Sequence, residues 1–395
     1  MSVAFTVTTQ RGSIQARNTI QCTGTAPNVT EQDILGAARG GRVLVHFHGG
    51  LIDQAEGLRI ASRLSGCGCG VHYPAGRADV QLYVVWQSGL LDALTGILEG
   101  SVLGKVVKTV MNFFGAARGA VGWRATALPD DDASLERYYR RELQEALSEQ
   151  DLEANDLLLE EDARAGQKSF TAAATLVTVA VNATRAILAR RDRNPPDYSF
   201  EAMVREEVLN ASRLGLIGAR AWQQMKEDAA AHATGNFMDF FNQLHAVSEE
   251  VTLVGHSTGA ILIAELIRAL PAGFTGRRKL KVAFLAPALT VNGLNACQQA
   301  LRRHVALPFP VYLMRNEVEM DDRSITWGGV NFYPGSLLQL VNFVFESPLP
   351  GQVMGWAYYA DQHRQEWSGL LTLHTDHTCT THGGFDDAQD ILDRI

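Results

Sequence analysis

The sequence VTLVGHSTGAILIAEL, residues 251–266, contains the side chains best suited to chemistry. An apolar run precedes GHSTG and apolar residues at helical spacing follow it, which predicts a strand, a sharp turn and a helix. In that context a G-x-S-x-G sequence presents its serine hydroxyl at the edge of a sheet. Gly255 and Gly259 fit because a strained turn at Ser257 leaves little room for neighbouring Cβ atoms. An ordinary turn is the alternative, but the flanks favour Ser257 as a nucleophile.

A serine nucleophile needs a base that takes its proton and donors that hold an oxyanion. The segment HFHGGLID, residues 46–53, follows an earlier apolar run. It contains the His-Gly-Gly type of turn that offers backbone N–H groups to an oxyanion. Gly49 and Gly50 can bring the backbone close to a substrate carbonyl. A plain glycine turn after a strand is the alternative, and the later serine turn favours the oxyanion loop.

The base is expected after the last strand, where residues 373–392 read LHTDHTCTTHGGFDDAQDIL. His374 falls at the end of that strand and His377 in the middle of the loop. His382 is followed by two glycines and a helix, so its backbone can fold back toward Ser257. We therefore predict His382 as the base. A metal site made of His374, His377, Cys379 and His382 is the alternative, but it lacks the spacing of known zinc sites, so we expect neither a metal nor another cofactor.

The carboxylate that orients the base is expected after the strand FPVYLMRN, residues 309–316. Four acids follow it directly: Glu317, Glu319, Asp321 and Asp322. Spacing from the strand favours Glu317, and residue type favours Asp321. Both are retained as candidates, because loop geometry decides which carboxylate meets the imidazole.

Strands and helices that could position these residues occur at both ends of the chain. Short apolar or alternating runs predict strands at 4–10, 18–24, 42–50, 80–89, 251–257, 280–289, 309–316 and 369–375. Helical spacing predicts helices at 53–65, 259–270, 291–304, 336–346 and 385–395. This alternation predicts an α/β fold with a mostly parallel sheet covered by helices on both faces.

The middle of the chain has almost no strand pattern and is rich in Ala, Leu, Glu and Arg. We therefore expect three parts: residues 1–90 and 250–395 as the two halves of the sheet domain, and residues 91–249 as a helical insertion after the fourth strand. Within the insertion, residues 91–123 are amphipathic and weakly charged, which suits either a lid over an acyl chain or packing against the core. Packing against the core is favoured over contact with a membrane.

Together these motifs resemble the α/β-hydrolase superfamily over residues 42–87 and 251–395. The resemblance implies Ser257 as nucleophile, His382 as base and an acid among residues 317–322. It also implies oxyanion amides at Gly50 and Thr258. The crowded acid segment and the large insertion depart from the usual pattern.

The expected activity is that of a serine hydrolase of carboxylic esters, resembling an esterase or lipase, acting on a small-molecule ester or lipid-like substrate. A non-catalytic binding module with the same fold is the first alternative, because fold alone does not establish activity. An acyltransferase or a peptidase that uses the same residues is the second.

Composition bears on the protein's partners, on membrane insertion and on its location. The net charge is −8 and basic residues are not clustered, which argues against a nucleic-acid partner. The longest uncharged stretch, residues 169–184, is shorter than the ~20 apolar residues of a membrane span. Five scattered cysteines suggest reduced thiols, and the first residues do not resemble a secretory signal, so we expect a cytoplasmic location.

Overall fold

The structure is a computed structural model of the 395-residue chain. It describes residues 2–21, 28–50, 53–67, 70–86, 101–121, 131–147, 168–190, 193–195, 197–274, 278–323, 326–327, 330–331, 333–346 and 349–395.

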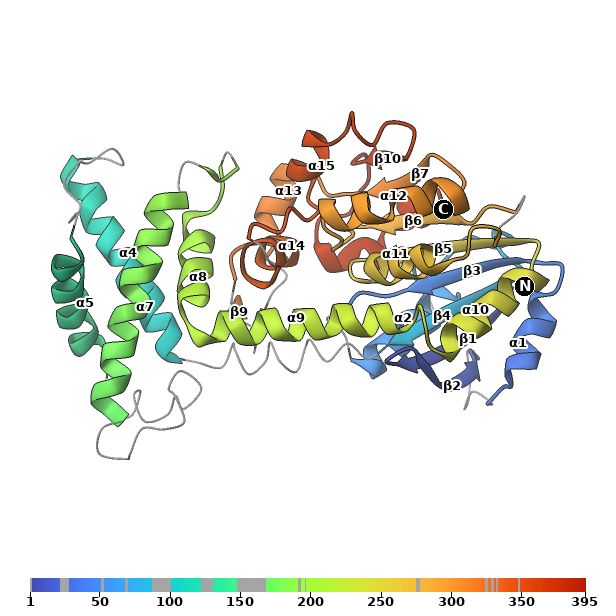
Figure 1. Cartoon of the computed structure of the whole chain (residues 1–395), viewed down its shortest axis with the longest axis horizontal. Coiled ribbons are helices and arrows are strands. Elements are labelled where there is room, and N and C mark those ends of the chain that lie inside the picture. Colours follow the sequence, from blue (N-terminus) through green and yellow to red (C-terminus); the bar gives the residue numbers. More distant parts are fainter. Residues whose placement is uncertain are drawn as a thin grey trace.

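An eight-stranded sheet forms the centre of one end of the molecule (Figure 1), with the strand order β10-β7-β6-β5-β3-β4-β1-β2. Its strands are β1 Val3–Gln10, β2 Ser13–Thr19, β3 Arg42–Phe47, β4 Val80–Trp86, β5 Glu250–His256, β6 Lys281–Leu285, β7 Phe309–Tyr312 and β10 Leu371–His374. The edge strand β2 is antiparallel to β1, and the other paired neighbours are parallel. The predicted α/β architecture with a mostly parallel sheet is confirmed.

Helices flank this sheet, as the alternation of strands and helices predicts. They include α1 Glu31–Ala38, α2 Gln54–Leu64, α10 Asn236–Val247, α11 Gly259–Ala269 and α12 Val291–His304. Every residue of β4 is buried, which explains why this strand reads as a continuous apolar run instead of an alternating one. The sheet places the carboxyl ends of β3 and β5 next to each other, since Phe47 pairs with Gly255.

Shorter elements follow β7. They are α13 Asn316–Asp321, the two-residue strands β8 Thr326–Trp327 and β9 Val330–Asn331, α14 Leu337–Leu340, the π-helix η3 Val341–Phe345, α15 Ala357–Gln362, the 3-10 helix η4 His382–Asp387 and α16 Gln389–Leu392. The acid-rich segment is therefore a short helix and not the predicted loop. The predicted closing helix 385–395 is wrong at residues 385–387, which end a 3-10 helix, and an α-helix occurs within this range only at Gln389–Leu392.

The regular elements that the structure describes in the middle of the chain are all helices. Its helices are α4 Ser101–Val121, α5 Asp132–Ala146, α7 Lys168–Arg190, α8 Phe200–Ala211 and α9 Arg213–Ala231. Figure 1 shows α4, α5, α7 and α8 grouped away from the sheet, with α9 running from this group toward the sheet. A 19-residue helix such as α9 spans about 28 Å. The parts of the expected helical insertion at residues 91–100, 122–130 and 148–167 lie outside the described residues.

The apolar side of α4 packs inside the helical group. Val106 and Val110 are fully buried, and α4 contacts α5, α7 and α8. This packing accounts for the amphipathic pattern without contact with a membrane. Helix α10, which the sequence analysis assigns to the insertion, instead packs against α1 and β2, and its Phe237 ring meets that of Phe47 on β3.

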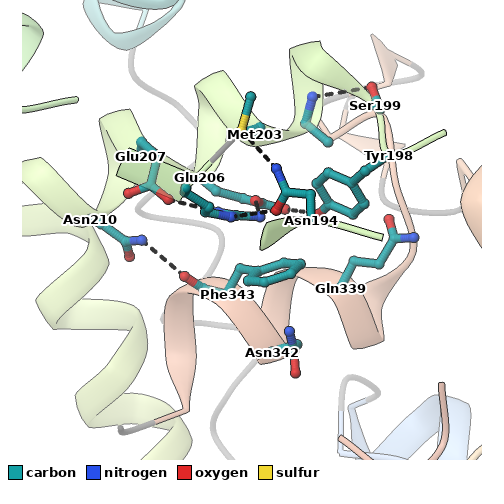
Figure 2. A network of polar contacts seen from close by, with 12 residues as sticks. Asn194, Tyr198, Ser199, Met203, Glu206, Glu207, Asn210, Gln339, Asn342 and Phe343 are labelled. Carbon is teal, nitrogen blue, oxygen red and sulfur yellow. Dashed lines mark hydrogen bonds and ion pairs between the residues drawn. The ribbon is translucent and has the colours of Figure 1, made fainter. Parts of the chain in front are cut away.

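A buried polar network joins the helical group to the segment after the acid-rich helix (Figure 2). The guanidinium of Arg190 pairs with Glu206 at 2.5 Å and with Glu207 at 2.7 Å. Glu206 also accepts hydrogen bonds from the hydroxyl groups of Tyr198 and Tyr333. Because Tyr333 comes from the chain after β9, this contact connects two regions that are far apart in sequence.

Two further contacts reinforce this junction. The Arg190 guanidinium lies 3.6 Å from the centre of the Phe343 ring, and Asn210 Nδ2 donates to the Phe343 carbonyl at 2.9 Å. Farther along α9, Trp222 Nε1 donates to Glu346 at 2.6 Å and Lys226 pairs with the same carboxylate at 2.5 Å. Both α8 and α9 are therefore attached to η3 and the residue that follows it.

Two sequence expectations about the chain's environment have different outcomes. None of the helices in the described residues is both long enough and apolar enough to cross a membrane. Cys67 is disulfide-bonded, whereas Cys297 and Cys379 are free, so the expectation of reduced thiols throughout is wrong at Cys67. A cytoplasmic location stays a prediction.

Candidate active site

Ser257 occupies a strained turn between β5 and α11. Its φ angle is +53°, in the left-handed region that residues other than glycine rarely adopt. The Ser257 amide donates to the Leu285 carbonyl on the next strand at 2.8 Å, and the Ser257 carbonyl accepts from Ala260 and Ala288. These bonds hold the turn in place, and such strain at a buried serine is typical of functional sites.

The glycines around Ser257 are required by close contacts. A Cβ atom on Gly255 would lie 2.8 Å from the Ala260 nitrogen, and one on Gly259 would lie 2.3 Å from the Phe47 carbonyl oxygen. Both separations are shorter than any van der Waals contact. The prediction that the turn leaves no room for neighbouring Cβ atoms is therefore confirmed.

His382 supplies the imidazole that meets this serine. Its Nε2 atom lies 2.9 Å from Ser257 Oγ, across 125 residues of sequence. His382 is the first residue of η4, and its side chain is buried. The structure thus brings together the two residues that the sequence analysis pairs as nucleophile and base.

The other two candidate histidines are engaged elsewhere. His374 stacks on the Tyr312 ring, and its Nδ1 atom is 3.9 Å from Asp376. His377 Nε2 donates to the Leu313 carbonyl at 2.8 Å. Within the described residues, no group of three or more His, Cys, Asp or Glu side chains is arranged to hold a metal ion.

Asp322 is the acid that hydrogen-bonds to His382. Its Oδ2 atom accepts from the backbone N–H of His382 at 2.8 Å, and its side chain is buried. The two acids favoured from sequence, Glu317 and Asp321, are exposed on α13. Glu317 and Asp321 are exposed because α13 turns both side chains outward. The helix ends just before Asp322. The structure does not bring Glu317 or Asp321 to the imidazole.

Glu319 lies on the buried side of the same helix. Burial raises the pKa of this carboxyl to about 8, against an opposing effect of the Ser336 hydroxyl, and the neighbouring Asp322 charge adds to the increase. Glu319 is therefore a neutral acid at pH 7. Of the four acids in the segment, only Asp322 combines burial with a hydrogen bond to His382.

The His-Gly-Gly turn lies against the serine turn. A Cβ atom on Gly49 would be 3.2 Å from Ser257 Cβ, and one on Gly50 would be 2.7 Å from Thr258 Oγ1. The two residues assigned as oxyanion donors, Gly50 and Thr258, are thus neighbours beside the serine. His48 anchors this turn, because its Nδ1 atom lies 2.6 Å from the Gly49 carbonyl oxygen and its Nε2 atom accepts from the Trp86 amide.

A second group of polar side chains lies behind the serine and histidine. Asp386 Oδ2 is 2.9 Å from His256 Nδ1, and Asp386 Oδ1 is 3.4 Å from His46 Nε2. The other nitrogen of His256 is 2.9 Å from the carbonyl oxygen of His382. His46 Nδ1 meets the Tyr73 hydroxyl at 2.8 Å. All of these side chains are buried.

Sequence reasoning missed this group. His256 could have been noticed, because a histidine directly before the serine is polar in an otherwise apolar strand. Asp386 had no such signal, since it lies in the segment read as a closing helix. Its carboxylate reaches His256 only because that segment is a 3-10 helix that begins at His382.

The electrostatic surroundings of His382 favour its neutral form. Burial lowers the pKa of His382 to about 3, with a further lowering by the charge of His256 and an opposing effect of Asp386. The Asp386 pKa lies well below its usual range despite burial, chiefly because the charge on His256 favours the carboxylate. His382 therefore presents a neutral imidazole that can accept a proton from Ser257.

Comparison with known proteins adds nothing to this geometry: no family model, curated protein or solved structure matches the chain.

Proposed function

We propose that this chain is a serine hydrolase that cleaves carboxylic esters through an acyl-enzyme intermediate. The observation that carries the proposal is the 2.9 Å contact between Ser257 Oγ and His382 Nε2, made at a buried serine with a φ angle of +53°. An ordinary glycine and serine turn has no reason to hold such strain against a buried neutral imidazole.

The first half of the reaction forms the acyl-enzyme. Ser257 Oγ gives its proton to His382 Nε2 and attacks the ester carbonyl carbon, which produces a tetrahedral oxyanion. The backbone N–H groups of Gly50 and Thr258 would hold that oxyanion. The bond from carbon to the alcohol oxygen then breaks, and the alcohol leaves with the proton from His382.

The second half releases the acid. A water molecule gives a proton to His382 Nε2 and its oxygen attacks the acyl carbon. Collapse of this second intermediate breaks the bond to Ser257 Oγ, which recovers its proton from His382. Asp322 fixes the backbone of His382 by accepting its N–H, and the negative charge of Asp386 favours the imidazolium that forms twice in the cycle.

The substrate is proposed to be a small-molecule ester or a lipid-like ester. Helices α8 and α9 contact η3, and α9 also contacts α11, the helix that follows Ser257. A role for the helical group as a lid is part of this proposal.

The test combines a covalent probe with a substrate series. A fluorophosphonate should label the wild-type protein at Ser257 and leave the Ser257→Ala variant unlabelled, and p-nitrophenyl esters of increasing acyl length should be hydrolysed with a preference that reports the acyl site. His374→Ala is the matched control and should behave as wild type.

Each contrary result has a distinct meaning. A folded protein that is neither labelled nor active would support a non-catalytic binding module. Labelling without release of acid in water, but with transfer to an added alcohol or amine, would support an acyltransferase. Labelling with cleavage of peptide but not ester substrates would support a peptidase.

A further inference from the structure

His256 stands between two hydrogen-bond acceptors. On one side is the Asp386 carboxylate, with Oδ2 2.9 Å from Nδ1, and on the other is the main-chain carbonyl of His382, with its oxygen 2.9 Å from Nε2. A carbonyl oxygen accepts and never donates. A neutral imidazole has one N–H group, so a neutral His256 could donate to either the Asp386 carboxylate or the His382 carbonyl, but not to both.

The surroundings of Asp386 favour its ionised form. Its Oδ1 atom faces His46 Nε2 at 3.4 Å, and the Arg63 guanidinium reaches the Asp386 carbonyl and pairs with the adjacent Asp387 at 2.5 Å. The Tyr73 hydroxyl lies on the other nitrogen of His46. His46 Nε2 and Asp386 Oδ1 face each other without a hydrogen bond, so among the described residues His256 Nδ1 is the side-chain donor to this carboxylate.

The backbone of His382 is held at both of its peptide groups. Its N–H donates to Asp322 at 2.8 Å, and its carbonyl lies against His256. Ser257, the next residue after His256, meets the ring of the same histidine at 2.9 Å. The end of β5 thus holds His382 by its carbonyl and by its ring at once, which sets the distance between nucleophile and base.

The geometry points to His256 as an imidazolium that, paired with Asp386, is a positioning residue for His382. This inference rests on the proposed function, and it adds a second histidine that acts through the backbone of the base and through its charge. The two rings are 5.4 Å apart between centroids. A fixed positive charge at that distance disfavours a second one on His382.

The charged and titratable groups around the two rings come from several elements. They are His46 on β3 and His48 just after it, Arg63 on α2, Asp322 after α13, Cys379 before η4, and Asp386 and Asp387 on η4. The positive charge of His256 and the negative charge of Asp386 oppose each other at His382. Loss of the His256 charge alone therefore raises the pKa of His382.

The decisive experiment is a ¹H–¹⁵N NMR titration of the histidine rings in the full chain. In the wild type, both ring nitrogens of His256 should carry hydrogen at pH 7. In Asp386→Asn the imidazolium signature of His256 should be lost. In His256→Gln the His382 titration should move to higher pH, and kcat/KM should fall by about 10²-fold, as expected for a misplaced catalytic group.

His374→Gln is the matched control, since it removes a partly buried histidine outside this group and should change none of these readouts. A neutral His256 in the wild type would overturn the inference, and so would an unchanged His382 titration in His256→Gln. If His256→Gln does not fold, the wild-type and Asp386→Asn spectra still decide the protonation state. Because the spectra need no turnover, an inactive wild-type protein would refute the ester hydrolase and leave the test of His256 intact.

Discussion

Asp322 Oδ2 accepts a hydrogen bond from the main-chain N–H of His382 at 2.8 Å, across 60 residues of sequence. This bond ties the residue after α13 to the residue that opens η4. It singles out one carboxylate from a cluster of four, and it makes the identity of the acid directly testable.

Replacing Asp322 by Ala should reduce kcat for ester hydrolysis by about 10²-fold, because it removes the acceptor that fixes the backbone of His382 and so misplaces the base. Glu317→Ala and Asp321→Ala are the matched controls, since both side chains are exposed on the neighbouring helix. Steady-state kinetics with one ester checks all three variants. Equal, small losses in the three variants would show that another acid orients the base.

Ser257→Ala should reduce kcat by roughly 10⁴ to 10⁶-fold. Ser257→Gly should be equally inactive but more stable than the alanine variant by about 1 kcal/mol, because glycine adopts a φ of +53° without a Cβ penalty. Urea unfolding of the two variants measures this difference. Ser65, at φ −76° in the right-handed region, is the control position, where alanine should be the more stable replacement. If the glycine and alanine variants had the same order of stability at both positions, the backbone at Ser257 would not be strained.

The free energy of unfolding should fall as pH decreases from about 6.5 toward 4. Burial lowers the pKa of His46, His48 and His232 to about 4 and that of His382 to about 3. In that window each of these four histidines binds a proton in the unfolded chain and not in the folded chain, which contributes up to about 1.4 kcal/mol per pH unit. Glu319, which is protonated in the folded chain, opposes this slope by the amount of one such group. The raised pKa of His256 adds no slope there, because its stabilisation is lost only as pH rises above its folded value.

Urea unfolding at several pH values checks this slope. His232→Gln should make it shallower, because this ring is one of the buried histidines with a lowered pKa. A stability that is independent of pH between 6.5 and 4 would mean that these histidines are not buried in the neutral form.

The lowered pKa of His382 also affects catalysis. Ester hydrolysis should persist well below pH 6, because the base is active when deprotonated and its pKa is lowered. A base with the pKa of a free imidazole would instead lose activity as the pH falls through about 6 to 7.

Arg190→Met should destabilise the protein by about 3 to 5 kcal/mol, because it leaves Glu206 buried without its counter-charge. Arg185→Met is the matched control on the same helix, since Arg185 pairs with the exposed Asp132 and such surface pairs contribute at most about 1 kcal/mol. Thermal or urea unfolding measures both. A similar small effect of both variants would show that the network in Figure 2 does not stabilise the junction.

The parts of the fold and site that could be predicted are those that depend on residues near one another in the sequence. The apolar run before Ser257 and the helical spacing after it define a strand, a turn and a helix, and their steric demand appears as Gly255 and Gly259. His382 could be predicted because the glycines after it let the chain fold back. These features depend on residues close in sequence, so a single sequence reveals them.

The parts that could not be predicted depend on which side of a short helix faces inward. Glu317 and Asp321 are as plausible as Asp322 until α13 forms and exposes the first two. Likewise, Asp386 becomes the partner of His256 only through the 3-10 geometry of η4. If such a short helix began one residue earlier or later, different side chains would face inward. The composition of the segment does not indicate where the helix begins.

The order of strands in the sheet also governs how the protein forms as it is synthesised. β3 lies between β4 and β5, so the four strands made first leave β3 with an open edge until the whole helical middle has been translated. An unpaired edge of buried, apolar strands is prone to associate with other chains. Ser257 then arrives with β5, and His382 and Asp386 arrive only with the final residues. A nascent chain on the ribosome therefore carries an exposed sheet edge long before it possesses an active site.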